Sequence, residues 1–316
     1  MMRSLKIVFM GTPDFAVASL ESILNANYNV VGVITAPDKP AGRGRKLQES
    51  PVKKFAVSKG LKVLQPTNLK DQAFIEELKA LEPNVQVVVA FRMLPKVVWD
   101  LPKFGTFNLH ASLLPQYRGA APINWAIINN ETKTGVSTFF LDEKIDTGAM
   151  ILQKEIDIAP EESVGELHDK LMELGSGLVV ETLELIENGN LTPTPQPFDE
   201  LLKDAPKLNR ENTKINWDDS LDQIYNLIRG LNPYPAAWSI LFNDNKEEKV
   251  KIYHCKKEAA SHSLENGRIL VEDKKLKVAV EGGYLIIEEL QLPGKRKMDV
   301  KSLLNGYDFT EGSKFR

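Results

Sequence analysis

Three side chains of the types used in acyl transfer lie close together in the sequence. Asn108 and His110 are separated by one residue, and Asp146 follows later in a short Asp-Thr-Gly turn. The amide can donate a hydrogen bond to an oxygen that becomes negative, and the imidazole can give or take a proton near neutral pH. The carboxylate can orient or ionise the imidazole. Together these groups could catalyse acyl transfer without a covalent intermediate.

The spacing of Asn108 and His110 fits a β-strand, because alternate residues of a strand leave the same face of its sheet. Leu109 should leave the opposite face of the sheet and pack in the hydrophobic core. Residues 115–119 contain proline and glycine and should turn the chain into a loop that borders a pocket. A lone histidine in a strand is more often a hydrogen-bonded core residue than a catalytic one. Only the nearby Asn108 and the later Asp146 favour a catalytic role for His110.

The first half of the chain alternates short apolar runs with helix-like stretches. Continuous Val, Ile and Leu is typical of parallel strands that are covered on both faces. The expected strands are Leu5–Met10, Val30–Ile34, Leu61–Leu64 and Val85–Ala90. The expected helices are Pro13–Leu24, Pro51–Ser58 with Ser50 as N-cap, and Asp71–Leu81. This order predicts an α/β fold with a doubly wound, Rossmann-like sheet.

The turn Gly11-Thr12-Pro13 lies between the first strand and the first helix, where nucleotide-binding folds place a phosphate loop. It lacks the G-x-G-x-x-G pattern, and no acidic residue follows where a ribose would be bound. A nicotinamide-dependent dehydrogenase is therefore disfavoured. A tight turn that needs glycine and a proline that starts a helix explain the segment without any ligand.

The chain changes character after residue 189. Ser163 and Glu166 form a capping-box pattern ahead of an amphipathic run that reaches about Glu187. Residues 190–206 are rich in proline and polar residues and predict an extended linker. Beyond it we expect a helix over Asp219–Arg229 and the strands Trp238–Phe242, Val250–His254, Gly267–Val271, Leu276–Val280 and Tyr284–Leu290. The expected parts are a first domain over 1–189, the linker, and a small β-barrel over 207–316.

Composition fits a two-domain globular protein: 316 residues, of which 42% are hydrophobic and 26% charged. The one cysteine excludes a disulfide framework and a cysteine-rich zinc site, and the four histidines show no ligand spacing, so we expect no metal. No apolar run of about 18 residues and no signal-peptide pattern occurs, which favours a cytoplasmic protein without a membrane partner. The net charge of −3 conceals a basic stretch over residues 38–54.

In their order and spacing these motifs resemble the folate-dependent formyltransferases. The resemblance rests on Asn108, His110, Ser112 to Pro115, Tyr117 to Gly119 and Asp146 to Gly148, and on Phe9 to Ala16, Pro37 to Gly44 and Leu231 to Pro235. It covers essentially the whole chain and points to the members that act on charged initiator tRNA. It implies a formyltransferase domain followed by an oligonucleotide-binding-like barrel. The implied donor is 10-formyltetrahydrofolate, and the implied acceptor is the α-amino group of methionine on initiator tRNA.

The resemblance also implies roles for individual residues. Asn108 and His110 would donate hydrogen bonds to the oxygen that becomes negative when the amine attacks, and His110 and Asp146 would move the protons. Folate contacts are expected at Phe91, Arg92, Met93, Leu94, Ser112, Leu113, Leu114, Pro115 and Asp142. Acceptor contacts are expected at Gly11, Thr12, Arg43, Arg45, Lys46, Lys207, Arg210, Lys295, Arg296 and Lys297.

Two of these segments raise separate questions. Phe91-Arg92 stands where the family commonly has Tyr-Gly. A backbone contact to the pterin would survive that change, whereas Arg92 either alters the loop or pairs with the glutamate tail of the folate. The basic residues 39–46 would be a solvated loop on charge alone. The resemblance instead places Arg43 against the acceptor stem of the RNA.

Other functions remain open on the sequence alone. A formyltransferase for a nucleotide-linked amino sugar would share the same three groups, and a folate-dependent hydrolase would use them to activate water. A formyl-enzyme formed on Ser112 is disfavoured, because no nucleophile-elbow pattern surrounds that serine. A pure RNA-binding module would need only the second domain. We expect the protein to be a monomer.

Overall fold

The computed structural model describes residues 4–41, 46–197 and 201–316. The chain folds into two compact units, each built from separate stretches of sequence. The first contains residues 1–119, 134–156 and 168–204, and the second contains 120–133, 157–167 and 205–316. The second unit therefore includes two segments that interrupt the sequence of the first. The division expected from the sequence, into continuous domains over 1–189 and 207–316 with a linker between them, stays a prediction.

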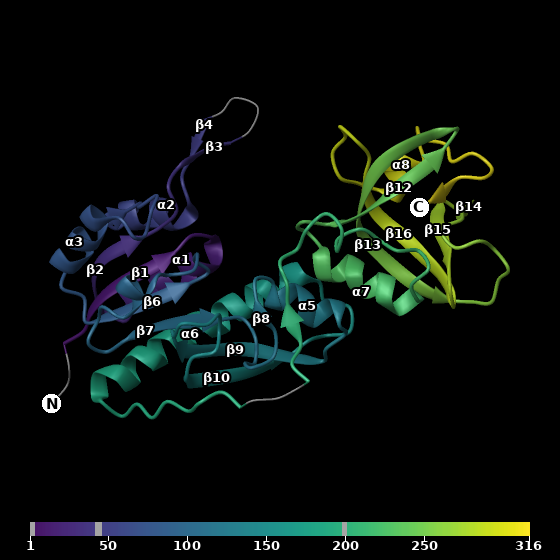
Figure 1. The fold of residues 1–316 in the computed structure, drawn as a ribbon. Helices are drawn as coiled ribbons and strands as arrows, with labels where there is room; N and C mark the ends of the chain where they lie inside the picture. Colours follow the sequence, from purple (N-terminus) through teal and green to yellow (C-terminus); the bar gives the residue numbers. More distant parts are fainter. Residues whose placement is uncertain (1–3, 42–45, 198–200) are drawn as a thin grey trace. The chain divides into compact units, whose positions relative to one another are not determined.

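A twisted sheet forms the centre of the first unit (Figure 1). Its strand order is β10-β9-β7-β6-β1-β2-β5, and β7, β6, β1, β2 and β5 are parallel to one another while β9 runs against β7. The bounds are β1 Lys6–Gly11, β2 Asn29–Ile34, β5 Val63–Leu64, β6 Val85–Val89, β7 Thr106–His110, β9 Lys133–Phe140 and β10 Met150–Asp157. The chain order reverses between β1 and β6, where open α/β sheets bind ligands. The doubly wound prediction is confirmed.

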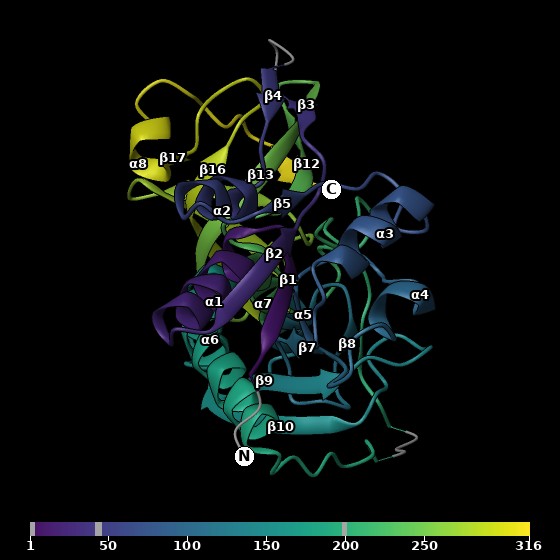
Figure 2. The same ribbon diagram turned by 90° about the vertical axis from the view of Figure 1, so that its left-hand side faces the viewer.

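Helices cover both faces of this sheet. They are α1 Asp14–Asn25, α2 Pro51–Ser58, α3 Gln72–Ala80, α4 Lys96–Trp99 and α6 Val164–Asn188. Seen along the sheet, α1 and α6 lie on one side and α3 and α4 on the other (Figure 2). Phe74 and Leu78 of α3 pack with Val8 and Val88 of the sheet. Burying side chains of this size contributes roughly 1.5–3 kcal/mol each.

Local signals in the sequence set the helix ends. The Ser50 hydroxyl accepts a hydrogen bond from the Lys53 amide at 3.0 Å, so the predicted N-cap of α2 is confirmed. The capping box ahead of α6 is also present, because Glu166 binds the Ser163 amide at 2.8 Å. Between β2 and α2 the chain forms a two-stranded hairpin of its own, β3 Lys39–Ala41 and β4 Lys46–Gln48.

The second unit is a nearly closed antiparallel barrel with helices packed on it. Its sheet has the order β14-β15-β16-β13-β12-β18, with β17 beside β16. The strands are β12 Ala237–Asn243, β13 Lys246–Ala259, β14 Ile269–Glu272, β15 Lys275–Val280, β16 Gly283–Gln291, β17 Met298–Asp299 and β18 Lys314–Phe315. A bridge from Arg268 to Lys314 joins the β18 edge to the residues just before β14. This confirms the predicted barrel.

Three helices belong to the second unit, namely α5 Pro122–Ile128, α7 Leu221–Leu231 and α8 Val300–Leu303. α5 and α7 approach closely at Gly230, where a Cβ would lie 2.6 Å from Ile128. The Asn124 amide also donates to the Gly230 carbonyl at 2.8 Å. A segment from the middle of the sequence therefore becomes part of the barrel unit.

Two short strands, β8 Arg118–Gly119 and β11 Asp204–Ala205, pair with each other. Within the described ranges no helix has the length and apolar character needed to cross a membrane. Among the same residues, no group of three or more His, Cys, Asp or Glu side chains comes together in a way that could hold a metal ion.

Candidate active site

The strand β7 presents Asn108 and His110 on one face of the sheet. Asn108 lies in register with Val88 of β6, whose side chain packs under α3, so Asn108 and His110 project from the α3 face. Leu109 points to the opposite face, because a Cβ at Gly175 of α6 would come within 2.8 Å of its Cδ2. The Asn108 amide has no hydrogen-bond partner among the described residues, which leaves it free to donate to a ligand.

His110 is held through one of its two ring nitrogens. Nε2 lies 2.8 Å from the carbonyl oxygen of Tyr117, and the side chain is only 7% exposed. A carbonyl oxygen can only accept, so Nε2 carries the proton of this bond. The second nitrogen, Nδ1, lies 3.8 Å from Asp146 Oδ2. Nδ1 is therefore the nitrogen that is available to give or take a proton, and it faces a carboxylate.

Asp146 is fixed by the backbone of β8. Its Oδ2 accepts a hydrogen bond from the Gly119 amide at 3.0 Å. Its backbone carbonyl and that of Gly148 both accept from the Gln196 amide at 2.9 Å. Gln196 in turn accepts from the Arg118 guanidinium at 2.6 Å. Arg118, Gly119 and Gln196 thus hold the carboxylate facing His110.

The turn that carries Asp146 depends on a glycine. A Cβ on Gly148 would lie 1.7 Å from the Phe140 carbonyl oxygen, a distance that no side chain can occupy. The Phe140 amide also donates to the Ala149 carbonyl at 2.9 Å, which closes the loop between β9 and β10. The loop therefore folds tightly enough to bring Asp146 back to the end of β7.

The residues after His110 form a rigid wall rather than a free loop. Ser137 of β9 donates to the Ser112 carbonyl at 2.6 Å and accepts from the Leu114 amide at 3.1 Å. Gln153 of β10 donates to the Leu114 carbonyl at 2.8 Å. The Ser112 hydroxyl is fully buried and donates to the Gln116 carbonyl at 2.7 Å. This arrangement gives Ser112 a structural task and leaves it no access to a substrate as a nucleophile.

The predicted folate segment lies at the carboxyl end of β6, beside the reversal point of the sheet. Within the described chain, the peptide groups of Phe91 through Leu94 make no backbone hydrogen bonds. They are therefore free to pair with a ring that carries both donors and acceptors, so the segment fits a pterin. Met93 is 69% exposed, and Leu94 is buried.

Arg92 has partners within the protein. Its guanidinium donates to the backbone carbonyls of Pro66 and Thr67, the latter at 2.9 Å, and lies 5.7 Å from the centre of the Phe91 ring. Both carbonyls belong to the segment between β5 and α3. The side chain thus ties the loop after β6 to that segment. These contacts give Arg92 a structural role that does not require the glutamate tail of a folate.

Asp142, predicted to contact folate, lies in the same loop as Asp146. Its carboxylate accepts from the Thr147 hydroxyl at 2.8 and 2.9 Å and from the Lys144 amide at 2.9 Å. Asp142 therefore braces the turn that carries Asp146.

Gly11 and Thr12 lie at the end of β1, next to the end of β6. A Cβ on Gly11 would lie 2.5 Å from that of Ala16 and 3.1 Å from the Val89 carbonyl, so the close approach requires glycine. The Thr12 carbonyl accepts a long contact, 3.5 Å, from the Val52 amide in the first turn of α2. Both residues thus border the crevice at the reversal point of the sheet.

The residues expected to bind RNA fall into several places. Arg43 and Arg45 lie outside the described residues, and Lys46 begins β4. In the second unit Lys207 and Arg210 are exposed, as are the residues of the predicted turn at 295–297. Lys297 is paired with Glu289 at 2.7 Å.

Arg210 belongs to a cationic cluster around Trp238, which we define as Arg210, Lys214, Trp238, Lys249 and Lys251. The charged groups of Arg210, Lys214 and Lys249 lie 5.4, 5.8 and 4.0 Å from the centre of the Trp238 ring. Burial, with the nearby charges of Arg210 and Lys251, lowers the pKa of Lys249. Within the described chain no carboxylate forms an ion pair with these four cations.

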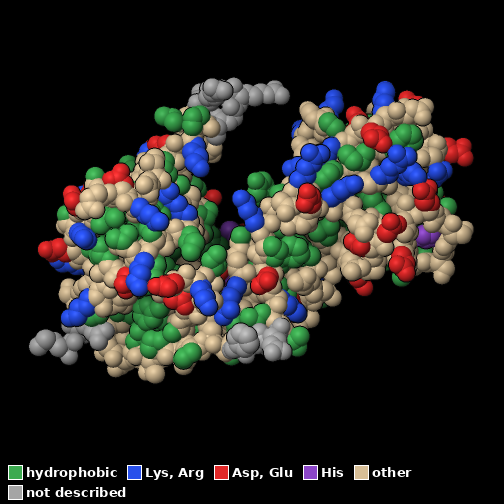
Figure 3. Space-filling model, in the orientation of Figure 1, with side chains coloured by type: hydrophobic (Ala, Val, Ile, Leu, Met, Phe, Trp, Pro, Cys, Tyr) green, Lys and Arg blue, Asp and Glu red, His purple; other side chains and the backbone are tan. Residues whose placement is uncertain are grey.

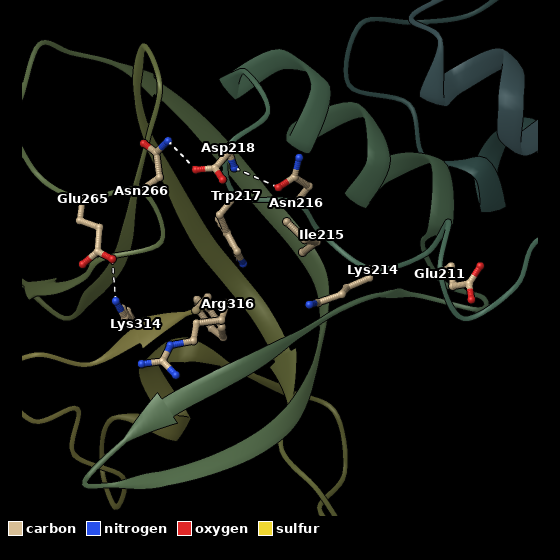
Figure 4. Close-up of a pocket in the computed structure, with 11 residues that line it drawn as sticks. Glu211, Lys214, Ile215, Asn216, Trp217, Asp218, Glu265, Asn266, Lys314 and Arg316 are labelled. Atoms are coloured by element: carbon tan, nitrogen blue, oxygen red, sulfur yellow. Dashed lines mark hydrogen bonds and ion pairs between the residues drawn. The ribbon is translucent and has the colours of Figure 1, made fainter.

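A pocket of about 440 Å³ adjoins the cationic cluster and shares Lys214 with it (Figure 4). Lys214 points its ammonium nitrogen into this space, Trp217 lies beside it, and Phe315 and Arg316 also line it. Glu265 accepts from Lys314 at 2.6 Å on the far rim. The pocket belongs to the barrel unit and contains none of the three predicted catalytic groups.

Sequence reasoning missed the residues that hold the site together. Gln196 lies in the proline-rich stretch that was predicted to be a linker, and nothing in its neighbourhood marks it. Ser137 and Gln153 lie on strands that no motif covered. Arg118 and Gly119 were part of a quoted motif, but their contacts to Gln196 and Asp146 required the structure.

Comparisons with known proteins place the whole chain among formyltransferases. Residues 5–183 match the family described as formyl transferase, and residues 207–308 match the formyl transferase C-terminal domain. The methionyl-tRNA formyltransferase of Flavobacterium johnsoniae is 59% identical over 313 residues and covers 99% of each chain. That of Bacteroides fragilis is 51% identical over 319 residues, covering 99% of this chain and 98% of its relative.

Solved structures share the fold at lower identity. HypX from Aquifex aeolicus in complex with tetrahydrofolic acid has a TM-score of 0.66 at 17% identity, covering 99% of this chain and 51% of its own. An N-formyltransferase from Helicobacter canadensis, in complex with folinic acid and dTDP-3-aminofucose, has a TM-score of 0.67 at 23% identity. The match covers 93% of this chain and all of the other.

Proposed function

Because the chain belongs to the formyl transferase family, we propose that it transfers the formyl group of 10-formyltetrahydrofolate to the α-amino group of methionyl-initiator tRNA. The observation that carries this proposal is full-length similarity of 50–59% to methionyl-tRNA formyltransferases, which spans both units. The product, N-formylmethionyl-tRNA, serves translation initiation. We propose the cytoplasm as the location and a monomer as the working unit, since one chain carries every group of the site.

The bound folate supplies an activated formyl group, and Asn108 and His110 act on its oxygen. When the amine attacks, that oxygen becomes negative. The free amide of Asn108 donates a hydrogen bond to it, and the imidazole can donate a second one through Nδ1 once it has taken up the proton of the amine. Such donors stabilise developing charge more strongly in a site that excludes water than in solution.

His110 and Asp146 move the protons. Since Nε2 is committed to the Tyr117 carbonyl, Nδ1 takes the proton that the amine loses and passes it to the departing folate nitrogen, directly or through water. The Asp146 carboxylate, 3.8 Å away, stabilises the imidazolium between the two transfers. The hydrogen bond from the Gly119 amide keeps this carboxylate facing the ring.

The second unit offers a surface for the RNA. On the face shown in Figure 3, lysine and arginine side chains gather on its upper part, while aspartate and glutamate are more frequent below. The cationic cluster around Trp238 holds four cations without a carboxylate partner among the described residues. Phosphates of an RNA backbone would relieve the repulsion among them, and the affinity should depend on salt.

The test is transfer of radiolabelled formyl from 10-formyltetrahydrofolate to methionyl-initiator tRNA, with a nucleotide-linked amino sugar and a reaction without acceptor in parallel. We expect label in the tRNA alone. Label in the sugar would keep the chemistry and overturn the acceptor. Formate released without an acceptor, and no label in the tRNA, would identify a hydrolase instead.

A further inference from the structure

The hairpin β3–β4 stands away from the rest of the first unit (Figures 1 and 2). It has three residues in each strand and pairs with no other strand of the described chain. An isolated two-stranded hairpin is marginally stable in water, and nothing in its own pairing fixes its direction. Its orientation must therefore come from contacts at its two ends.

Both ends of the hairpin meet at one ammonium group. Asp38 directly precedes β3, and Glu49 directly follows β4. Lys53 Nζ binds Asp38 Oδ2 and lies 2.9 Å from Glu49 Oε1. The Asp38 carboxylate also accepts from the Gln65 amide at 2.8 Å, and Gln65 donates as well to the Ala36 carbonyl at 2.8 Å.

The position of Lys53 is unfavourable for its own helix. It is the third residue after the N-cap Ser50, in the first turn of α2. Backbone dipoles make the first turn of a helix favour acidic residues and disfavour cations, and α2 has no acid there. A lysine at this position is explained by the two carboxylates that it joins. Hydrogen bonds to Asp38 and Glu49 raise the pKa of Lys53, and hydrogen bonds from Gln65 and Lys53 lower the pKa of Asp38, so both groups stay charged.

The pair is also shielded more than a surface ion pair. The Lys53 side chain is 18% exposed and that of Asp38 is 23% exposed. Exposed ion pairs are weak because water and salt screen them, whereas shielded bridging contacts resist screening. α2 is joined to the end of β1 through Val52 and Thr12 and to β2 through Ser50 and Thr35, whose hydroxyls are 2.7 Å apart.

We propose that Lys53, through its contacts to Asp38 and Glu49, is a positioning residue that fixes the direction of the β3–β4 hairpin for the acceptor tRNA. This inference rests on the proposed function for the identity of the acceptor. Fixing the hairpin before binding lowers the ordering cost of association. Lys53 itself touches neither the formyl donor nor the reacting atoms.

The test compares Lys53→Met with Lys53→Arg and with a matched control, Lys54→Met. Lys54 is the next residue of the same turn, is exposed and makes no ion pair with the described residues. Its substitution by methionine therefore removes the same charge and leaves the contacts of Lys53 with Asp38 and Glu49 intact. We expect Lys53→Met to raise the KM for methionyl-tRNA about tenfold, with kcat and the KM for the formyl donor unchanged within about twofold. Lys53→Arg should restore the KM, and Lys54→Met should change it by less than about threefold.

Hydrogen exchange separates positioning from simple charge attraction. Amides of Lys39–Ala41 and Lys46–Gln48 should exchange faster in Lys53→Met than in the wild type, and at the wild-type rate in Lys54→Met. Equal KM changes in both variants, or unchanged exchange in the hairpin, would overturn the proposal. If the wild type transfers nothing to tRNA, the proposed function fails, while the exchange measurement still decides whether Lys53 orders the hairpin.

Discussion

The two ring nitrogens of His110 have separate tasks. Nε2 is bound to the Tyr117 carbonyl, so the ring cannot rotate without losing that bond, and Nδ1 faces Asp146. The carboxylate is fixed in turn by the Gly119 amide. This is an oriented acid–base pair at the end of a strand, with the free amide of Asn108 on the same face. We therefore expect the proposed chemistry to depend on the charge of Asp146 as well as on its hydrogen bond.

Asp146→Asn separates these two contributions. The amide oxygen of asparagine can still accept from Gly119, but the charge that stabilises an imidazolium is removed. We expect kcat to fall about 10²-fold, with the KM for both substrates changed by less than about threefold. Steady-state kinetics with each substrate varied provides the measurement. Glu143→Gln is the matched control: the residue lies in the same loop, pairs with exposed Lys96 and no other described residue, and its substitution should keep kcat.

At the scale of elements, the site is assembled where strand ends meet loops that are held by hydrogen bonds and close packing. β7 brings Asn108 and His110, and the loop between β9 and β10 returns Asp146. Ser137 and Gln153 lock the wall beyond His110. A change that displaces the returning loop should therefore abolish activity without touching any reacting group.

Gly148→Ala tests this dependence. Its Cβ would lie 1.7 Å from the Phe140 carbonyl, which is held in β9. We expect the free energy of unfolding to fall by about 2 kcal/mol or more, and transfer to be lost in the fraction that still folds. Gly177→Ala in α6 is the control, because a Cβ there meets nothing within 4 Å. It should raise stability by about 0.5–1 kcal/mol and leave kcat unchanged. Thermal or urea unfolding measures both.

Cys255 of β13 reports on the packing of the barrel. Burial raises the pKa of its thiol well above the ordinary range. In the folded protein the reactive thiolate should be nearly absent at pH 8 and should stay so at pH 9, because the folded pKa lies above both. We expect iodoacetamide to label the native protein at a small fraction of the rate seen in denaturant. Fast labelling of the native protein would contradict the buried position.

The sequence predicted most of the elements, for reasons that are local. The N-cap Ser50, the capping box at Ser163 and the apolar runs of β1 and β6 carry their signals within a few residues. β13 was expected over 250–254 but runs over 246–259, because its first part pairs with β12 and its second part pairs with β16. The contacts of Gln196 and the joining of α5 to α7 depend on distant segments, which no local pattern records.

At the scale of the whole molecule, the two units carry different parts of the proposed function. The first holds Asn108, His110 and Asp146, the proposed catalytic groups, and the second holds the cationic cluster around Trp238. The net charge of −3 hides this division, because RNA binding depends on where the cations lie rather than on their sum.

Changing Lys214 and Lys249 together to alanine should weaken tRNA binding and reduce its dependence on salt. Each phosphate contact that is lost should lower the slope of log affinity against log salt by about 1. Filter binding at several salt concentrations gives this slope. The KM for the formyl donor should not change. An unaltered slope would remove the cluster from the RNA interface.

The most direct test of the account is a single-turnover measurement, in which the enzyme exceeds the methionyl-initiator tRNA and labelled 10-formyltetrahydrofolate is saturating. Under these conditions the rate reports chemistry rather than product release. The account predicts that the wild type labels the tRNA and that His110→Ala slows this step by about 10²–10⁴-fold while binding the tRNA normally. Transfer by His110→Ala at the wild-type rate would contradict the assignment of the imidazole, and with it the mechanism.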